Sequence, residues 1–254
     1  DLGRDVLSRV VLATRISLQV AVVSVAFAFV LGVSVGIVSG YVRGWLDTIL
    51  MRLVDVMFAF PVLLLALAIV AILGPGVTTT MLAIGIVYTP IFARVARASA
   101  LSVSVSPFVQ VSRTMGSPWW FIMSRRVLPN ISGPIIVQAS LSLAFAILSE
   151  AALSFLGLGI QPPTPSWGRM LSEAQGFLGQ AWWMSVFPGL AIFVTALAFN
   201  WSGTVCATSS TRGSAPSSSP GGSDDRSRHL RLRPHGRDRT SRDRPRGLLR
   251  PRGG

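Results

Sequence analysis

The stretch from residue 16 to residue 40 is the feature that most limits what this chain can fold into. It is strongly apolar and contains no charged side chain. A helix needs about 20 predominantly apolar residues to cross a bilayer, and this stretch supplies them. Gly32, Gly36 and Gly40 recur at every fourth position, a small-residue pattern that lets membrane helices approach closely. We interpret this pattern as helix packing, with the face of a gate as the alternative.

Further apolar segments predict an all-α fold, a polytopic transmembrane helical bundle. Pro61 is expected to kink the second segment and Pro90 to interrupt the third, because a proline inside a helix removes a hydrogen bond. Arg52 and Asp55 lie three residues apart and are expected to pair on one helix face. The five predicted spans cover about residues 16–40, 49–73, 79–104, 131–156 and 184–201.

Composition agrees with a membrane protein and disfavours several classes of enzyme. Half of the residues are hydrophobic and only 13% are charged, whereas soluble domains average about 25% charged residues. The chain contains no lysine and therefore lacks the P-loop lysine that a nucleotide-binding ATPase needs. Cys206, His229 and His235 all follow the last span, which leaves the apolar body without the residues of a nucleophilic or metal site. We expect no catalytic residue, no metal site and no enzymatic activity.

The interval between the third and fourth spans has a helical pattern of its own. Phe108, Val111 and Met115 fall at helical spacing, and Gly116-Ser117-Pro118 then breaks the run. A second short amphipathic piece follows and is expected to end at Pro129. This pattern predicts a helix-turn-helix that lies on the membrane surface and is bound by another protein.

The same interval carries a family resemblance. Gly116, Ile122 and Leu128-Pro129-Asn130 resemble the "EAA" loop through which ABC-importer permeases dock to their ATPase subunit. Where that motif has Glu-Ala-Ala, this sequence has Gln110-Val111-Ser112. The resemblance implies a cytoplasmic coupling loop over residues 105–130. Its candidate contact residues are Phe108, Gln110, Val111, Ser112, Arg113, Met115, Gly116, Ile122, Leu128 and Pro129.

Strings outside the loop narrow the resemblance to one branch of the family. The residues from Glu150 to Gly159, from Gln161 to Gly168 and from Asp1 to Arg9 resemble the dipeptide/oligopeptide/nickel branch of binding-protein-dependent inner membrane components. The resemblance covers about residues 1–200. It implies a permease subunit that forms the translocation path of an ATP-driven importer for peptides or a similar small solute. The alternatives are a non-functional truncated or frameshifted paralogue and a stand-alone secondary transporter.

The resemblance also implies a set of partners. These are a second permease subunit, two ATP-binding subunits, an external solute-binding protein and the lipid bilayer. No nucleic acid is expected, and no cofactor is expected in this chain, since ATP is hydrolysed by the partner subunit.

Arginine placement predicts how the chain sits in the membrane. The loop region from Arg94 to Arg126 is rich in arginine and contains no acid, whereas the loops at 74–78 and 157–181 hold only Arg169 against Glu173. The positive-inside rule therefore places the 105–130 loop and the C-terminus in the cytoplasm of a bacterial inner (plasma) membrane. Arg94 and Arg97 are expected where the third span leaves the bilayer.

Glu150 is the one charged residue of the fourth span. An acid at membrane depth is by default a functional candidate that faces a polar cavity. Glu150 is therefore a possible translocation-path residue. The alternative is that it lies near the outer interface and orders the adjoining turn.

The two ends of the chain depart from the resemblance. Residues 1–15 are expected to be an external segment before the helix, with the first membrane helix of the family missing. Residues 203–254 are rich in Arg, Ser, Gly and Pro and predict a disordered tail. An Arg-rich tail suits RNA or anionic lipid, but we favour a frameshift after Asn200. Sequencing the locus tests this hypothesis, because an intact reading frame in related strains would end it.

Overall fold

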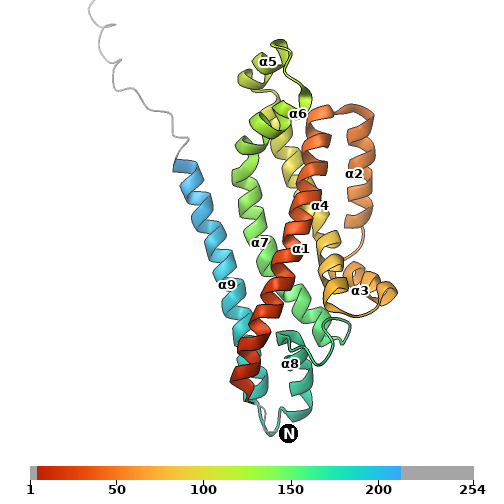
Figure 1. Ribbon diagram of the computed structural model, residues 1–254, viewed down its shortest axis with the longest axis vertical. Helices are drawn as coiled ribbons and strands as arrows, with labels where there is room; N and C mark the ends of the chain where they lie inside the picture. The colour runs from red at the N-terminus through yellow and green to blue at the C-terminus, as the bar shows by residue number, and fades with distance from the viewer. Residues whose placement is uncertain (1–4, 213–254) are drawn as a thin grey trace, which may run out of the picture. The chain divides into compact units, whose positions relative to one another are not determined.

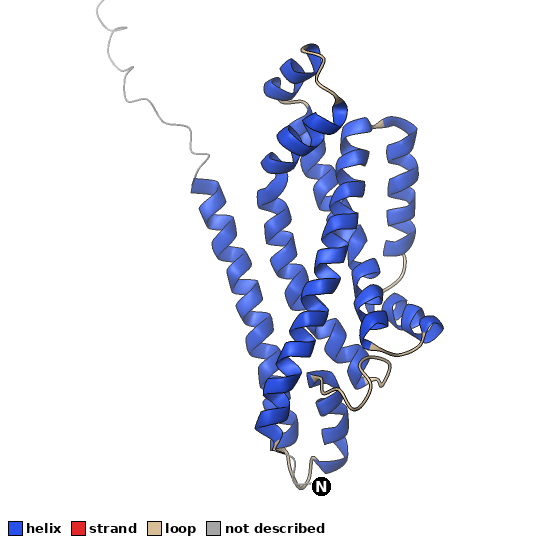
Figure 2. Ribbon diagram, viewed as in Figure 1, coloured by secondary structure: helices blue, strands red, loops and turns tan. Residues whose placement is uncertain are grey.

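The described part of the chain is built from helices alone. The computed structural model describes residues 5–212, with the side chains through residue 203, and every regular element within them is helical (Figures 1 and 2). This confirms the all-α expectation. The elements are α1 (Val6–Val42), α2 (Gly44–Phe58), α3 (Val62–Leu73), α4 (Val77–Ser104), α5 (Pro107–Thr114), α6 (Trp119–Ile122), α7 (Leu128–Phe155), α8 (Trp167–Ala174) and α9 (Trp183–Arg212). A π-helical turn (Met123–Val127) joins α6 to α7, and a 3-10 turn (Gln175–Phe177) follows α8.

Four helical segments are long and apolar enough to cross a membrane, and a bent pair makes a fifth candidate. The four are α1, α4, the continuous stretch from Trp119 to Phe155, and α9. The predicted 49–73 span differs from a single straight helix, because α2 and α3 meet at 90°. Pro61 explains the break, since it has no N–H to donate and disfavours helical geometry at Phe60 before it. The predicted kink is therefore a complete break.

Helix α1 begins earlier than the apolar pattern indicates. Residues 6–15 were expected to precede the helix, but α1 starts at Val6. The Asp5 carboxylate caps it by accepting hydrogen bonds from the N–H groups of Leu7 and Ser8. The Ser8 hydroxyl also donates to Asp5, and this bond is the main reason that the pKa of the Asp5 carboxyl lies below its ordinary value. Residues 1–4 of the predicted external segment lie outside the described residues.

Two expectations about the middle of the chain are wrong. Pro90 does not interrupt the third span, because α4 continues through it. Pro90 is buried against neighbouring helices, the setting in which membrane helices tolerate proline. Asp55 does not pair with Arg52. It accepts a hydrogen bond of 2.8 Å from Arg94 Nη2 on α4 instead.

The glycine pattern of α1 serves helix packing, as expected. A Cβ atom added at Gly32 would lie 2.5 Å from the Thr89 carbonyl oxygen, and one at Gly40 would lie 2.9 Å from that of Arg97. At Gly36 it would collide with the Ala93 carbonyl oxygen. The backbones of α1 and α4 therefore touch along three turns, and a side chain at any of these glycines would force them apart.

Helix α9 runs past the predicted end of the last span. It extends from Trp183 to Arg212, so residues 203–212 are helical rather than part of a disordered tail. The remainder of the predicted tail, residues 213–254, lies outside the described residues.

Candidate functional site

The predicted coupling segment forms two short helices at one end of the bundle (Figure 1). Pro107 occupies the first turn of α5, where its missing N–H is harmless. Gly116 ends α5 with a φ of 75°, a left-handed conformation that favours glycine. No atom lies within 4 Å of a Cβ built there, so the backbone angle rather than crowding requires glycine. The helix-turn-helix expected from the sequence is confirmed.

The two short helices divide into an inner and an outer face. Phe108, Val111, Met115 and Trp119 are exposed, and Met115 has 79% of its surface accessible. We call these four residues the outer apolar face. The candidate contact residues Gln110, Arg113, Leu128 and Pro129 are also exposed. An apolar patch presented this way is typical of a protein-binding surface.

Two of the candidate contact residues lie on the inner face instead. Ser112 is buried and donates to the Phe108 carbonyl oxygen at 2.8 Å, and Ile122 is buried in the bundle core. Their helical positions turn them toward the bundle, where Val109 and Val127 are also buried. Ser112 and Ile122 therefore hold the segment in place and offer almost no surface to a partner.

Arg113 and Gln110 bond within the chain. Arg113 Nε donates to the Tyr41 hydroxyl at 3.1 Å, and the guanidinium carbon lies 4.4 Å from the centre of the Tyr41 ring. Gln110 Nε2 donates to the Val105 carbonyl oxygen at 3.0 Å. Arg113 thus ties α5 to the end of α1, a contact across 72 residues of sequence.

Pro129 does not end the second piece of the segment. The chain stays helical from Trp119 through Phe155. The π-helical turn before Pro129 widens the helix, and the Leu128 N–H reaches back to the Met123 carbonyl oxygen. A widened turn accommodates a residue that cannot donate to an α-helical hydrogen bond. α6 and α7 are therefore parts of one continuous helix.

Charge pairs connect α2 to α4, and sequence reasoning missed the stronger one. Arg97 donates twice to the Asp47 carboxylate, at 2.6 and 2.8 Å, and Asp47 also bonds Ser39 of α1. Arg94 bonds Asp55 and stacks on the Phe58 ring with its guanidinium carbon 3.9 Å from the ring centre. A bidentate arginine–carboxylate pair is directional and resists shear. No local spacing signals it, because 50 residues separate its partners.

Glu150 is fully buried at the C-terminal end of α7. The Ser154 hydroxyl donates to Glu150 Oε1 at 2.8 Å and accepts from the Ile160 N–H at 3.1 Å. Glu150 is therefore linked through Ser154 to the turn that follows α7, a contact that the alternative interpretation requires. It does not face an open cavity, and a role in the translocation path stays a prediction.

Replacing Ser154 with alanine is expected to destabilise the protein by about 1–3 kcal/mol. The change leaves the buried Ile160 N–H without its Ser154 partner and removes one hydrogen bond from the buried Glu150 carboxylate. Thermal unfolding of the detergent-purified protein measures the effect. Ser132→Ala is the matched control, because exposed Ser132 on the same helix bonds only the Pro129 carbonyl oxygen. Equal melting temperatures for the two variants would contradict the assigned role of Ser154.

An apolar cavity of about 370 Å³ lies between α3, α4 and α7. Its polar edge is the Tyr88 hydroxyl, 3.1 Å from the Ser149 hydroxyl. No local pattern in the sequence indicates this cavity, because its walls come from three segments far apart in the chain. Its lining residues are Val62, Leu63, Tyr88, Ile91, Phe145, Leu148 and Ser149.

The described residues of the site supply contact surfaces and connections between helices. Among the side chains that the structure describes, residues 5–203, no three of His, Cys, Asp or Glu gather closely enough to hold a metal ion. What the described residues provide is an exposed apolar face on α5 and α6, one continuous helix from α6 into α7, and charge pairs between α2 and α4.

A family model described as "Binding-protein-dependent transport system inner membrane component" matches residues 32–209. The chain belongs to this family.

Two relatives of similar sequence are named as transport permeases, one for glutathione and one for di- and tripeptides. The chain is 44% identical to the glutathione transport system permease protein of Pectobacterium atrosepticum over 79% of its own length and 66% of the relative. It is 45% identical to the di/tripeptide transport system permease protein of Pseudomonas aeruginosa over 80% of its length and 67% of the relative. The chain thus spans about two thirds of the length of these relatives.

Solved structures support the same fold. A chain of the MetNI methionine ABC transporter in an inward-facing conformation aligns with a TM-score of 0.68 and 17% identity, covering 80% of this chain and 96% of that one. A chain of an amino acid ABC transporter aligns with a TM-score of 0.59 and 15% identity, covering 82% of this chain and all of that one. At these identities the likeness shows the fold alone. A polytopic membrane bundle of the ABC-importer permease type is therefore confirmed.

Proposed function

We propose that this chain is the permease subunit of an ATP-driven importer of peptides or similar small solutes, and that α5 and α6 couple it to a separate ATPase. The observation that carries the proposal is the outer apolar face formed by Phe108, Val111, Met115 and Trp119. These side chains are exposed although the helices that bear them are anchored to the bundle. Membership of the binding-protein-dependent family and the peptide specificity in the relatives' names support it.

The proposed assembly contains a second permease subunit, two ATP-binding subunits and an external solute-binding protein in the inner membrane. The α5–α6 end and the C-terminus face the cytoplasm, where ATP is available. The partner ATPase hydrolyses ATP, and this chain supplies the moving membrane path. Arginine enrichment from Arg94 to Arg126 supports this orientation.

The coupling mechanism follows from how the short helices are attached. A displacement of α5 is transmitted to α1 through the Arg113–Tyr41 contact. A displacement of α6 is transmitted to α7 because the two form one continuous helix. The α1–α4 glycine contact and the Asp47–Arg97 pair carry the displacement onward as movement of packed helices. The ATPase must contact the outer apolar face differently in its two states, because only differential contacts shift a conformational equilibrium.

Cysteine labelling tests the proposed orientation and partner. In a Cys206→Ser background, Met115→Cys is expected to react with a membrane-impermeant maleimide in inside-out vesicles but not in intact spheroplasts. It is also expected to cross-link to an ATP-binding subunit, since Met115 is the most exposed residue of the outer apolar face.

A cysteine at Leu178 provides the topological control. Leu178 lies beyond α8 and is 52% exposed, and its cysteine variant is expected to react only from outside. Labelling of the Met115 variant in spheroplasts, or cross-linking to no ATP-binding subunit, would overturn the proposed coupling role.

A further inference from the structure

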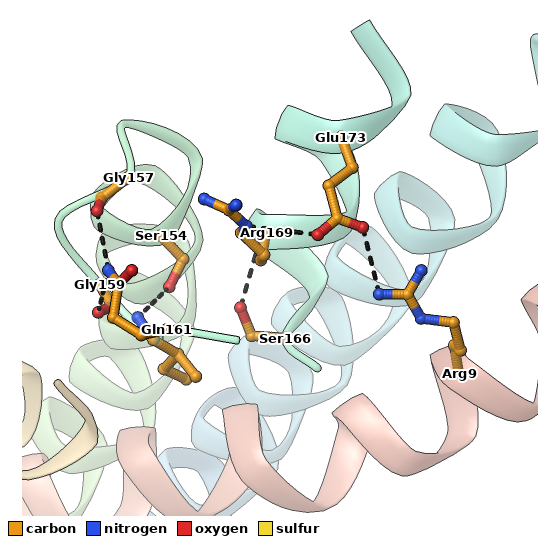
Figure 3. A network of polar contacts seen from close by, with 9 residues as sticks. Arg9, Ser154, Gly157, Gly159, Gln161, Ser166, Arg169 and Glu173 are labelled. Carbon is orange, nitrogen blue, oxygen red and sulfur yellow. Dashed lines mark hydrogen bonds and ion pairs between the residues drawn. The ribbon is translucent and has the colours of Figure 1, made fainter. Parts of the chain in front are cut away.

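A second cavity, of about 380 Å³, lies between the start of α1 and α8. Arg9 of α1 and Arg169 and Glu173 of α8 line it together with Pro163, Phe177 and Met184. Figure 3 shows the charged side chains converging, with the Glu173 carboxylate between the two guanidinium groups. The volume falls within the range of small-molecule clefts, roughly 300–1,000 Å³.

The charges of this cavity do not balance. Glu173 Oε2 lies 3.1 Å from Arg9 Nη2, and Glu173 Oε1 lies 3.3 Å from Arg169 Nε. Two guanidinium groups thus share one carboxylate, which leaves one positive charge in excess among the lining residues. Neither arginine makes another side-chain hydrogen bond within the described residues, so most of their N–H donors are unused. The three side chains are about one third exposed, which leaves them accessible to a ligand.

Hydrogen bonds fix the segments that form the walls of the cavity. The Ser166 hydroxyl caps α8 by accepting from the Arg169 N–H at 3.3 Å. Trp167 is buried and donates from Nε1 to the Val10 carbonyl oxygen of α1 at 3.1 Å. Gln161 Nε2 donates to the carbonyl oxygens of Gly157 and Gly159 and shapes the preceding loop (Figure 3). The segments that carry Arg9 and Arg169 are therefore held in place before a ligand arrives, which reduces the entropy lost when it binds.

We propose that this cavity binds a small solute through its carboxylate, such as the C-terminus of a short peptide. The carboxylate is held by Arg9 and Arg169 in competition with Glu173, and the apolar wall formed by Pro163, Phe177 and Met184 receives the adjoining side chain. Arginine suits this role because its planar donors match a carboxylate. The inference rests on the proposed function only for the class of solute.

Titration of the full-length chain in lipid nanodiscs, without ATP, tests the proposal. The probes are the dipeptide Ala-Ala and its C-terminal amide, measured by calorimetry and by the shift in melting temperature. Ala-Ala is expected to bind and to stabilise the protein, and the amide to bind at least about tenfold more weakly, because it lacks the charge. Since no ATPase takes part, failure here would leave the coupling proposal standing.

Substitutions at the three charged residues give effects of opposite sign. Arg9→Gln and Arg169→Gln are each expected to weaken Ala-Ala binding about tenfold or more, whereas Glu173→Gln is expected to tighten it about threefold by removing the competing carboxylate. A purely structural network predicts that all three variants melt earlier and that none binds more tightly. Equal binding of the dipeptide and its amide to the unmodified protein would also overturn the proposal.

A different result would show that this cavity binds part of a partner protein instead of a small solute. If neither probe binds, but Arg9→Gln reduces stimulation of ATP hydrolysis by the external binding protein, the cavity receives an acidic side chain of that protein. That outcome would overturn the assignment of a small solute.

Discussion

Gly36→Leu is expected to prevent α1 and α4 from packing and to remove most folded protein from the membrane. A Cβ at this position would collide with the Ala93 carbonyl oxygen and would lie 2.7 Å from the Ala96 Cβ and 2.9 Å from the Arg97 nitrogen. Two of these atoms are backbone and cannot rotate away. Overpacking in a well-packed core typically costs 1–3 kcal/mol, and a leucine against rigid backbone is expected to cost about 3 kcal/mol or more. Proteins are stable by only about 5–15 kcal/mol, so this is a large share of the total.

The measurement is the melting temperature and yield of the detergent-purified protein. Gly189→Leu is the matched control: it introduces the same side chain into α9, where no atom lies within 4 Å of an added Cβ. The control is expected to fold with near-normal yield, because leucine also favours a helix more than glycine does. If Gly36→Leu melted at the same temperature as Gly189→Leu, the close α1–α4 contact would not contribute to stability.

Val111→Glu combined with Met115→Glu is expected to abolish solute uptake while leaving the isolated protein as stable as before. Both side chains are exposed, so the fold tolerates the charge. Docked against an ATPase, however, the same carboxylates would be buried in an apolar interface without a partner, which is strongly unfavourable. Loss of one interface hot spot costs about 2 kcal/mol or more, or roughly a 30-fold loss of docking affinity.

Uptake and ATP hydrolysis in proteoliposomes are the readouts, with the melting temperature of the isolated chain beside them. Thr114→Glu adds a negative charge to the same short helix at a position outside the outer apolar face and is expected to retain uptake. Normal uptake in the double variant would remove the apolar face from the coupling proposal. A fall in melting temperature would instead show that Val111 and Met115 support the fold.

Local patterns predicted the elements well where one helix alone decides the outcome. The charge-free run at residues 16–40 and the four-residue glycine repeat identified α1 and its packing face. The turn at Gly116 followed from a residue that tolerates a positive φ. The effect of proline was harder to predict. Pro61 lies at a break between two helices, whereas α4 continues through Pro90. The difference arises from burial against neighbouring helices, which no local pattern contains.

The sequence alone determined that this chain is a helical membrane protein with a separate surface segment, because hydrophobic length and helical periodicity are properties of contiguous residues. Only the tertiary structure decided which residues meet. Ser112 and Ile122 are buried against the bundle. Asp55 pairs with Arg94 instead of Arg52, and Arg9 pairs with Glu173. Each of these outcomes depends on how distant helices pack, and neither composition nor spacing along one helix specifies that arrangement.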